Sequence, residues 1–500
     1  MTTRVRPSPM TWPRRALGTT LKLTLGLATL AGVAVAGVTV SSPSTSQPVP
    51  TSPDASTASL RHTEPGLVAN PTAMRQDRRL VVAFVVGASG TVASDLLAPY
   101  DIFASSPAFT TYVVAQVASP APLEGGPAVV PTYAFSDVDA DPTLTPDLVV
   151  VPGLAEPTGA LEAPLRTWVT HQHKGGAKVL GVCSGSLALA ATGMLDGLHA
   201  TSHWSRVGAL EASRPAVHWM RGRTYVEDGT VTTTAAVTSG VPAALHLVAE
   251  LAGPAEAQRV AALHPELRWT PTTSTTIPED HFEAHDWPVG LNYVMPWFRP
   301  TVGIAMENGV GELDATAAFE VYSQSAAART VALAEGNSVR TRHGLVLLTT
   351  SYTGAAGVSR VVVPGADTIN AVDLRLRAWA DQQRLSVEPL TVRPGPDGSV
   401  GGGFTAALEN LAAHTDAATA SATAKMVGYP TTTLALVQQQ RSWRPVFLLI
   451  AALALAVLVA LAPGQLARRR HRRHLTRHAA VSLGRPGIPL ISTPRQKESS

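Results

Sequence analysis

Short runs of consecutive apolar residues alternate with longer amphipathic stretches between residues 79 and 254. Uninterrupted apolar runs of this length are typical of parallel strands that are buried on both faces. Strands are predicted at 80–86, 112–117, 147–151 and 179–182, with helices at 94–103 and 161–174. Strands that alternate with helices predict a doubly wound α/β sheet, in which sites form at the carboxyl ends of the strands.

Part of this pattern recurs in the second half of the chain. The segment Ser94–Phe103 aligns with Leu313–Tyr322, and Val149–Gly153 aligns with Val361–Gly365. Each aligned helix follows an apolar strand and a glycine-containing loop, so the repeat predicts a duplicated domain. The second copy is expected to be degenerate, because residues 385–399 contain no cysteine where the first copy has one.

Both ends of the chain carry a basic segment beside an apolar one. Residues 1–22 are basic and contain no acid, and residues 23–40 are apolar. This order predicts a signal peptide, with Ala34-Val35-Ala36 as the candidate cleavage site, or an uncleaved N-terminal membrane anchor. Residues 446–462 are uninterruptedly apolar and are followed by the basic run 468–473. They predict a transmembrane helix with a cytoplasmic C-terminus.

These segments together predict a protein of the cell membrane, single-pass or two-pass, with its main domains outside the cytoplasm and its C-terminal tail inside. The basic tail is expected to flank the membrane and to bind no nucleic acid. The predicted division of the chain is a signal peptide or anchor (1–40), a Ser/Thr/Pro-rich linker (41–78), a first domain (79–254), a connector (255–299), a degenerate second copy (300–440), a transmembrane helix (446–462) and a basic tail (463–500).

Composition narrows the chemistry. The chain is 45% hydrophobic and 15% charged, with a formal net charge of +3 and one cysteine. A single cysteine excludes an intrachain disulfide framework. We find no dinucleotide fingerprint, phosphate-binding loop or zinc-ligand spacing in the sequence, so neither a cofactor nor a metal is expected.

The single cysteine lies at a junction between a predicted strand and a predicted helix. The apolar run Val179–Val182 precedes Cys183, and Ser184, Gly185 and a run of alanines and leucines follow it. This arrangement is typical of a nucleophile elbow, which holds a side chain at the end of a sheet. The N-terminus of the following helix favours the thiolate. The alternative is a buried structural cysteine.

The segment Gly181–Trp204 resembles the ThiJ/PfpI family of class I glutamine-amidotransferase-like domains. Within that family it is most similar to isonitrile hydratases and to the sensor halves of AraC-type regulators. The resemblance continues over residues 79–253. It implies a flavodoxin-like doubly wound parallel sheet, here duplicated, with the transmembrane helix added at the C-terminus.

The resemblance also implies roles for residues around Cys183. Asp95 matches the acid that the family places beside the cysteine, although an aspartate here would also suit the N-cap of its helix. The aligned Asp314 keeps the acid without a cysteine, which favours capping. Ser184 stands where hydratase-like members have threonine, and its hydroxyl would orient a water or the substrate, or simply cap the elbow helix.

Two further features complete the implied site. His203 matches a family histidine that could serve as a base or orienting group, whereas a lone histidine is more often a packing residue. The oxyanion donors would be the backbone N–H groups of Ser184 and Leu154. The family usually has a second glycine after Pro-Gly where this chain has Leu154.

Three functions remain open from the sequence: two that use a site, and a purely structural ectodomain. The first is cysteine-dependent hydratase or hydrolase chemistry on a small electrophile such as an isonitrile, amide or aldehyde. The second is a non-catalytic small-molecule or redox sensor. Both predict a small-molecule substrate or ligand and a membrane partner, and the repeat predicts either a homodimer or intramolecular pairing of the two copies. Fold alone cannot choose between an enzyme and a sensor.

Overall fold

The computed structural model describes residues 14–41, 79–264, 269–390, 403–431, 434, 436, 443–444 and 446–462. The chain divides into two units. One unit is Gly37–Pro445, and the other combines Met1–Ala36 with Val446–Ser500. The larger unit carries both predicted copies and is described first.

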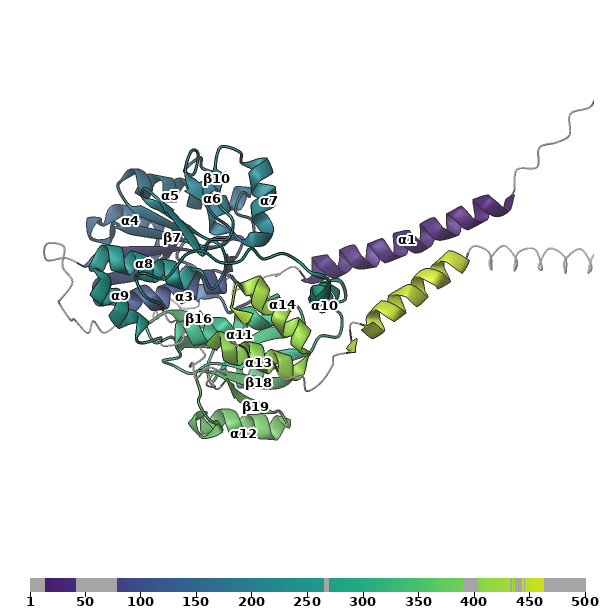
Figure 1. The fold of residues 1–500 in the computed structure, drawn as a ribbon. Coiled ribbons are helices and arrows are strands. Elements are labelled where there is room, and N and C mark those ends of the chain that lie inside the picture. Colours follow the sequence, from purple (N-terminus) through teal and green to yellow (C-terminus); the bar gives the residue numbers. More distant parts are fainter. Residues whose placement is uncertain are drawn as a thin grey trace, which may run out of the picture. The chain divides into compact units, whose positions relative to one another are not determined.

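A seven-stranded sheet forms the core of the first half (Figure 1). Its order is β11-β12-β8-β7-β1-β3-β6, and every neighbouring pair is parallel except β11 with β12. The strands are β1 (Leu80–Val85), β3 (Phe109–Ala115), β6 (Tyr133–Ala134), β7 (Leu148–Val151), β8 (Lys178–Gly181), β11 (Tyr225–Asp228) and β12 (Val231–Thr234). All six residues of β1 are buried, as expected for a strand covered on both faces.

Helices cover both faces of this sheet. One face packs against α3 (Ala93–Ala104), α8 (Gly240–Ala252) and α9 (Pro254–Ala261). The opposite face packs against α4 (Phe135–Ala140), α5 (Ala163–Lys174) and α6 (Gly185–Ala190). Outside the layers are α7 (Trp204–Ser213) and the short pair β9 (His199–Ala200) and β10 (His218–Trp219). This is the parallel α/β arrangement that the apolar runs predict.

The second half has a smaller parallel sheet with the order β17-β14-β13-β18-β19. Its strands are β13 (Thr301–Ala305), β14 (Arg329–Ala334), β17 (Thr350–Ser351), β18 (Val358–Pro364) and β19 (Val387–Leu390). Its helices are α11 (Glu312–Gln324), α12 (Leu374–Gln383), α13 (Gly403–His414) and α14 (Ala417–Val427), preceded by α10 (Trp287–Val294) in the connector. When the strands of the two halves are matched in chain order, this sheet has the same strand order as the part β6-β3-β1-β7-β8 of the first sheet.

The two halves pack together through corresponding helices, α3 and α11. Two hydrogen bonds join them at aligned positions. Ser94 Oγ donates to Glu320 Oε2 over 2.7 Å, and Leu313 N donates to Asp101 Oδ2 over 3.0 Å. Ser94 aligns with Leu313 and Asp101 with Glu320, so the two bonds are reciprocal, as in a two-fold interface.

Small sheets add further links between segments. A three-stranded sheet joins β5 (Val129–Val130) of the first half to β16 (Val346–Leu348) and β15 (Ser338–Arg340) of the second. A second pair consists of β2 (Thr91–Val92) and β4 (Leu123–Glu124). The backbone therefore pairs directly across the junction of the halves.

The terminal unit contains helical segments of both chain ends. The helix α1 (Arg14–Ser41) covers the apolar N-terminal segment, and residues 446–462 form a helix. A Cβ on Gly26 would lie 3.8 Å from both Ala456 O and Ala460 Cβ, so the two helices approach closely at small residues. The predicted linker beyond Ser41 and the basic tail 463–500 lie outside the described residues.

The membrane predictions are contradicted. Within the described part of the chain, no helix is long and apolar enough to cross a membrane. The helix over 446–462 rises about 25 Å at 1.5 Å per residue, against a hydrocarbon core of about 30 Å. In α1, threonines and glycines interrupt the apolar run. The prediction of a transmembrane helix is therefore wrong. The predicted membrane partner and the cell-membrane localisation with extracytoplasmic domains depended on that helix and are withdrawn with it.

Candidate functional site

Cys183 lies in a sharp turn between β8 and α6. Its φ is +53°, in the left-handed region that costs a residue with a Cβ roughly 1–2 kcal/mol. Hydrogen bonds hold it there: Cys183 N donates to Thr234 Oγ1 over 3.0 Å, and its carbonyl accepts from Ser186 Oγ at 2.9 Å and Ser202 Oγ at 3.2 Å. Strain that the surroundings maintain in this way is typical of functional positions.

The turn also depends on Gly185. A Cβ at this position would lie 2.0 Å from Val151 O and 2.9 Å from Pro152 O. No side chain fits in that space, because backbone atoms cannot move aside cheaply. Gly185 therefore lets the elbow rest against the end of β7, which brings the loop Pro152–Leu154 beside Cys183.

Asp95 does not cap its helix. The N-cap of α3 is Val92, and the Asp95 side chain is fully buried, with Oδ2 accepting a 3.0 Å hydrogen bond from Gly153 N. The Cys183 side chain acts on the pKa of this carboxyl, and Asp95 Oδ1 has no hydrogen-bond partner among the described residues. Burial raises the pKa of Asp95 well above its usual range, and the charge of Glu320 raises it further. Both effects favour the neutral form of the carboxyl.

The thiol of Cys183 is likewise neutral at rest. Burial raises its pKa well above the usual value, and Asp95 raises it further whenever that carboxyl is ionised. The Ser184 N–H and the charge of Arg206 act in the opposite direction but do not outweigh burial. The expected thiolate at the helix N-terminus is thus not the resting form, since α6 is a helix of only 6 residues and the sulfur is desolvated.

Ser184 belongs to the same cluster. It occupies the N-cap of α6 but makes no side-chain capping bond. A Cβ on Gly153 would lie 2.5 Å from Ser184 Oγ and 2.6 Å from Asp95 Oδ2. The hydroxyl and the carboxyl therefore both face Gly153, next to the sulfur. The structure brings together Cys183, Asp95 and Ser184, as expected from the sequence.

The two implied oxyanion donors are placed differently. The Ser184 N–H acts to lower the pKa of the Cys183 thiol. Leu154 is buried in an antiparallel bridge with Thr91. The hydrogen bonds of that bridge run from Val92 N to Gly153 O (2.8 Å) and from Ala155 N to Gly90 O (3.0 Å). They are made by the two neighbours of Leu154 and do not involve the Leu154 N–H.

His203 is turned toward the second half of the chain. Its Nε2 donates to Met426 O in α14 over 2.8 Å. Its Nδ1 accepts from Ser205 N at 3.3 Å and lies 2.8 Å from Ser205 Oγ, so it caps α7. Burial lowers the pKa of His203. Both ring nitrogens of this neutral imidazole are engaged away from the thiol, in the packing role that was the alternative.

Sequence reasoning missed two carboxyls whose charges act on the site. Glu320, from α11, is buried, and its charge raises the pKa of both Asp95 and Cys183. Glu124, in β4, has a pKa raised to about 7 by burial and by Glu320. The repeat offered one clue to Glu320, because this residue of α11 aligns with Asp101, an acid at the matching position of α3. The second half therefore contributes to the surroundings of the first half's cysteine.

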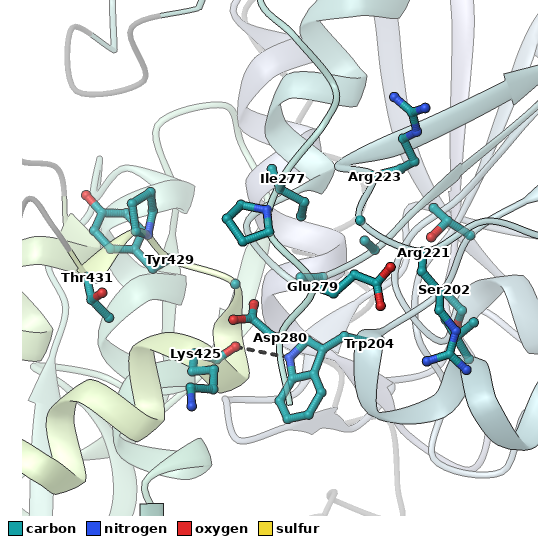
Figure 2. A pocket seen from close by; sticks show the side chains of 18 of the residues that line it. Ser202, Trp204, Arg221, Arg223, Ile277, Glu279, Asp280, Lys425, Tyr429 and Thr431 are labelled. Carbon is teal, nitrogen blue, oxygen red and sulfur yellow. Dashed lines mark hydrogen bonds between the residues drawn. The ribbon is translucent and has the colours of Figure 1, made fainter. Parts of the chain in front are cut away.

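A pocket of about 460 Å³ lies beside the elbow (Figure 2). The first half, the connector and α14 all line it. Ser202 links it to the elbow, since its hydroxyl binds the Cys183 carbonyl. Trp204 forms one wall, with Nε1 donating to Lys425 O over 3.1 Å. The volume is in the range of small-molecule sites.

Known proteins resemble the first half of the chain. The DJ-1/PfpI family model matches residues 81–250. An isonitrile hydratase of Pseudomonas putida is 33% identical over 174 residues, which are 33% of this chain and 70% of the relative. The HTH-type transcriptional regulator CdhR of Pseudomonas aeruginosa is 31% identical over 139 residues, 27% of this chain and 41% of the regulator.

Solved structures include related folds. The crystal structure of a ThiJ/PfpI family protein from Pseudomonas syringae has 29% sequence identity and a TM-score of 0.34, covering 40% of this chain and 82% of that one. Residues 81–250, which the family model matches, contain the elbow, Asp95 and the strands of the seven-stranded sheet except Leu80. From the extent of the hydratase match, this chain belongs to the DJ-1/PfpI family.

Proposed function

We propose that the first half is a cysteine-dependent hydratase or hydrolase that acts on a small electrophile, with an isonitrile as the leading substrate class. The observation that carries the proposal is the placement of the buried Asp95 carboxyl, whose pKa is raised, close to the strained Cys183, since each side chain acts on the pKa of the other. A nucleophile and a proton donor then meet at one point. The similarity to an isonitrile hydratase supports the substrate class.

An isonitrile suits this pair because its terminal carbon accepts both a nucleophile and a proton. The sulfur of Cys183 would bond to that carbon, Asp95 would give the carbon its proton, and the S–H proton would pass to the Asp95 carboxylate. The product of this step is a thioimidate on Cys183. Water then adds to the same carbon, the C–S bond breaks, the thiol recovers its proton and an N-substituted formamide leaves.

Neighbouring groups can assist the second step. The hydroxyl of Ser184, which faces Gly153 beside Asp95, is placed to orient the attacking water. Glu124, with a pKa raised to about 7, is a second group that can exchange a proton near neutral pH. His203 has no step in this scheme, because both its nitrogens are engaged elsewhere.

Incubation of the full chain with an alkyl isonitrile tests the proposal. We expect the N-alkyl formamide by mass spectrometry, with none above background for Cys183→Ala and Cys183→Ser. Circular dichroism should show both variants folded. An intact wild-type protein that forms neither a formamide from isonitriles nor a carboxylic acid from small amides would overturn the proposal.

A sensor function is the second candidate, and the pocket beside the elbow favours it. The residues that line this pocket include Ser202 and Trp204 but not Cys183, so a ligand could bind there without contacting the sulfur. A regulator is among the similar proteins. Under this alternative, a small molecule would raise the Tm of Cys183→Ala as much as that of the wild type.

We also propose the domain division on which both functions rest. Residues 79–254 carry the site, and residues 300–440 are a degenerate second copy. The shared strand order and the reciprocal α3–α11 bonds support this division. They also favour intramolecular pairing of the copies over a homodimer through the same helices, since α11 already covers that face of α3.

A further inference from the structure

A second cluster of chemically active side chains lies at the junction of the two halves. Asp101 is in α3, Glu312 begins α11, His343 follows β15 and His264 follows α9. Asp101, Glu312 and His343 place one ligand atom each within 4.8 Å of one another. These residues are far apart in the sequence, so no ligand spacing could reveal them.

The distances in this cluster suit a common central ion. His343 Nδ1 lies 3.0 Å from Glu312 Oε2 and 3.4 Å from Asp101 Oδ1, and His264 Nε2 lies 3.7 Å from Asp101 Oδ1. Tetrahedral zinc with ligand bonds of 2.0–2.1 Å separates its ligand atoms by about 3.3 Å. The two His343 separations lie close to that value, and His264 adjoins the group through Asp101 at 3.7 Å.

Second contacts hold the carboxylates in place. Leu313 N donates to Asp101 Oδ2 over 3.0 Å, which leaves Oδ1 facing the two histidines. Thr341 Oγ1 donates to Glu312 Oε1 over 2.5 Å, which leaves Oε2 facing His343. Ser105 Oγ lies 3.4 Å from His343 Nε2 and 3.5 Å from Asp101 Oδ1. Outer contacts of this kind orient ligands in metal sites.

The electrostatics of the cluster also call for a cation. The side chains of Asp101 and Glu312 are 1% and 0% exposed, and those of His343 and His264 are 18% and 7% exposed. Two adjacent buried carboxylates are costly without compensating positive charge. A divalent ion would neutralise both, whereas histidine protons would have to be supplied one at a time.

We propose that Asp101, Glu312, His343 and His264 bind one divalent transition-metal ion, zinc by preference, which fastens the two halves together. Two imidazoles and two carboxylates form a nitrogen and oxygen donor set that suits zinc, whereas calcium and magnesium favour oxygen alone. Four protein ligands close the coordination shell, so the ion would be structural. The site is separate from Cys183 and does not depend on the proposed reaction.

The test uses the full chain, treated with EDTA and then given one equivalent of Zn²⁺. We expect one zinc per chain by elemental analysis after desalting, and a Tm that rises with zinc. His343→Ala and Glu312→Gln should each weaken zinc binding at least tenfold. Glu320→Gln is the matched control. Glu320 is the buried acid of α11 that aligns with Asp101, but it contacts Ser94 and Gln324 and no histidine of the proposed site.

Two results would overturn the site. One is a folded wild-type protein that retains no zinc and shows the same Tm in zinc and in EDTA. The other is zinc binding that survives in both His343→Ala and Glu312→Gln. If either variant fails to fold, His264→Ala supplies the same comparison, and it should lose most of the zinc-dependent rise in Tm.

Discussion

The two halves of the chain share one frame, meaning the same order of strands and the same placement of the first helix. They differ in the side chains that this frame carries. In the first half, Asp95 lies at Gly153, in the turn after β7. In the second, Asp314 lies at Gly365, in the turn after β18, where a Cβ on the glycine would be 3.4 Å from Asp314 Oδ2. Each acid comes from the first turn of the aligned helix, α3 or α11. The frame alone therefore places an acid at this turn, with or without a cysteine.

The acids beside Cys183 and the buried Glu388 of the second half have opposite pKa shifts. Burial raises the pKa of Asp95 and of Glu124, and Arg206 opposes the shift of Glu124 without reversing it. In the second half, burial would also raise the pKa of Glu388 in β19. Hydrogen bonds from His414 and Asn410 and the charge of Arg360 instead lower it to about 2.

This difference separates a candidate site from a structural network. Acids whose pKa is strongly shifted cluster at functional sites, because a shifted pKa suits a group to transfer protons. An acid with its partners complete, such as Glu388 with Arg360, Asn410 and His414, contributes to stability instead. The second half shares its strand order with the first, and its Glu388 is held by a complete set of partners.

The strongest test of this comparison changes the two aligned acids. Asp95→Asn keeps the shape but removes the proton donor, so we expect kcat to fall by about 10²–10⁴-fold. Asp314→Asn should leave kcat within about twofold, since the frame places that acid without a nucleophile. Formamide release from an alkyl isonitrile measures both. Equal losses would mean that the acid serves the fold in both halves.

The glycines at the two turns provide a second, smaller contrast. Gly153→Ala would press on Ser184 Oγ and Asp95 Oδ2, at 2.5 and 2.6 Å, so we expect a loss of roughly tenfold in kcat with little change in stability. Gly365 has φ +72°, so Gly365→Ala should cost about 1 kcal/mol of stability and leave kcat unchanged. Steady-state kinetics and urea unfolding separate the two effects. The contrast fails if Gly153→Ala loses stability but not activity.

Local patterns in the sequence predicted the parts of the site that are set by neighbouring residues. The apolar run before Cys183 and the small residues after it are enough to indicate the elbow, because the strand, turn and helix are adjacent in the chain. The frame of the parallel sheet then brings Asp95 and Ser184 to the same edge. The roles of Asp95 and Ser184 come from the resemblance to the ThiJ/PfpI family, whereas the elbow itself can be predicted from the local pattern.

Long-range packing decided what the sequence could not show. His203 is engaged by Met426 and the charge of Glu320 acts on the Cys183 thiol, and both effects depend on how the second half docks. The resting charge of Cys183 also escaped prediction, because the depth of burial outweighs a short helix N-terminus. The apolar run 446–462 predicted a span from composition, but within the described residues no helix is long and apolar enough to cross a membrane.

The smallest expected effect concerns stability against pH, and its sign should differ between the halves. The folded-state pKa of Glu388, about 2, lies below its unfolded value, so its contribution is present above about pH 4.3 and is lost as the pH falls toward 2. Glu388→Gln should therefore cost about 1–2 kcal/mol at pH 7, discounted for partial solvent screening, and almost nothing near pH 2.

Asp95 should behave in the reverse way. Its folded-state pKa is raised, so its favourable contribution is complete below the unfolded pKa of about 3.9 and is lost as the pH rises through the folded value. Asp95→Asn should then be neutral in acid and stabilising in alkali, even though it abolishes turnover. Urea unfolding of both variants between pH 3 and pH 9 measures the two slopes. If both variants destabilise the protein at pH 7 and recover in acid, Asp95 is a satisfied structural acid like Glu388, and the contrast between a reactive half and a structural half is wrong.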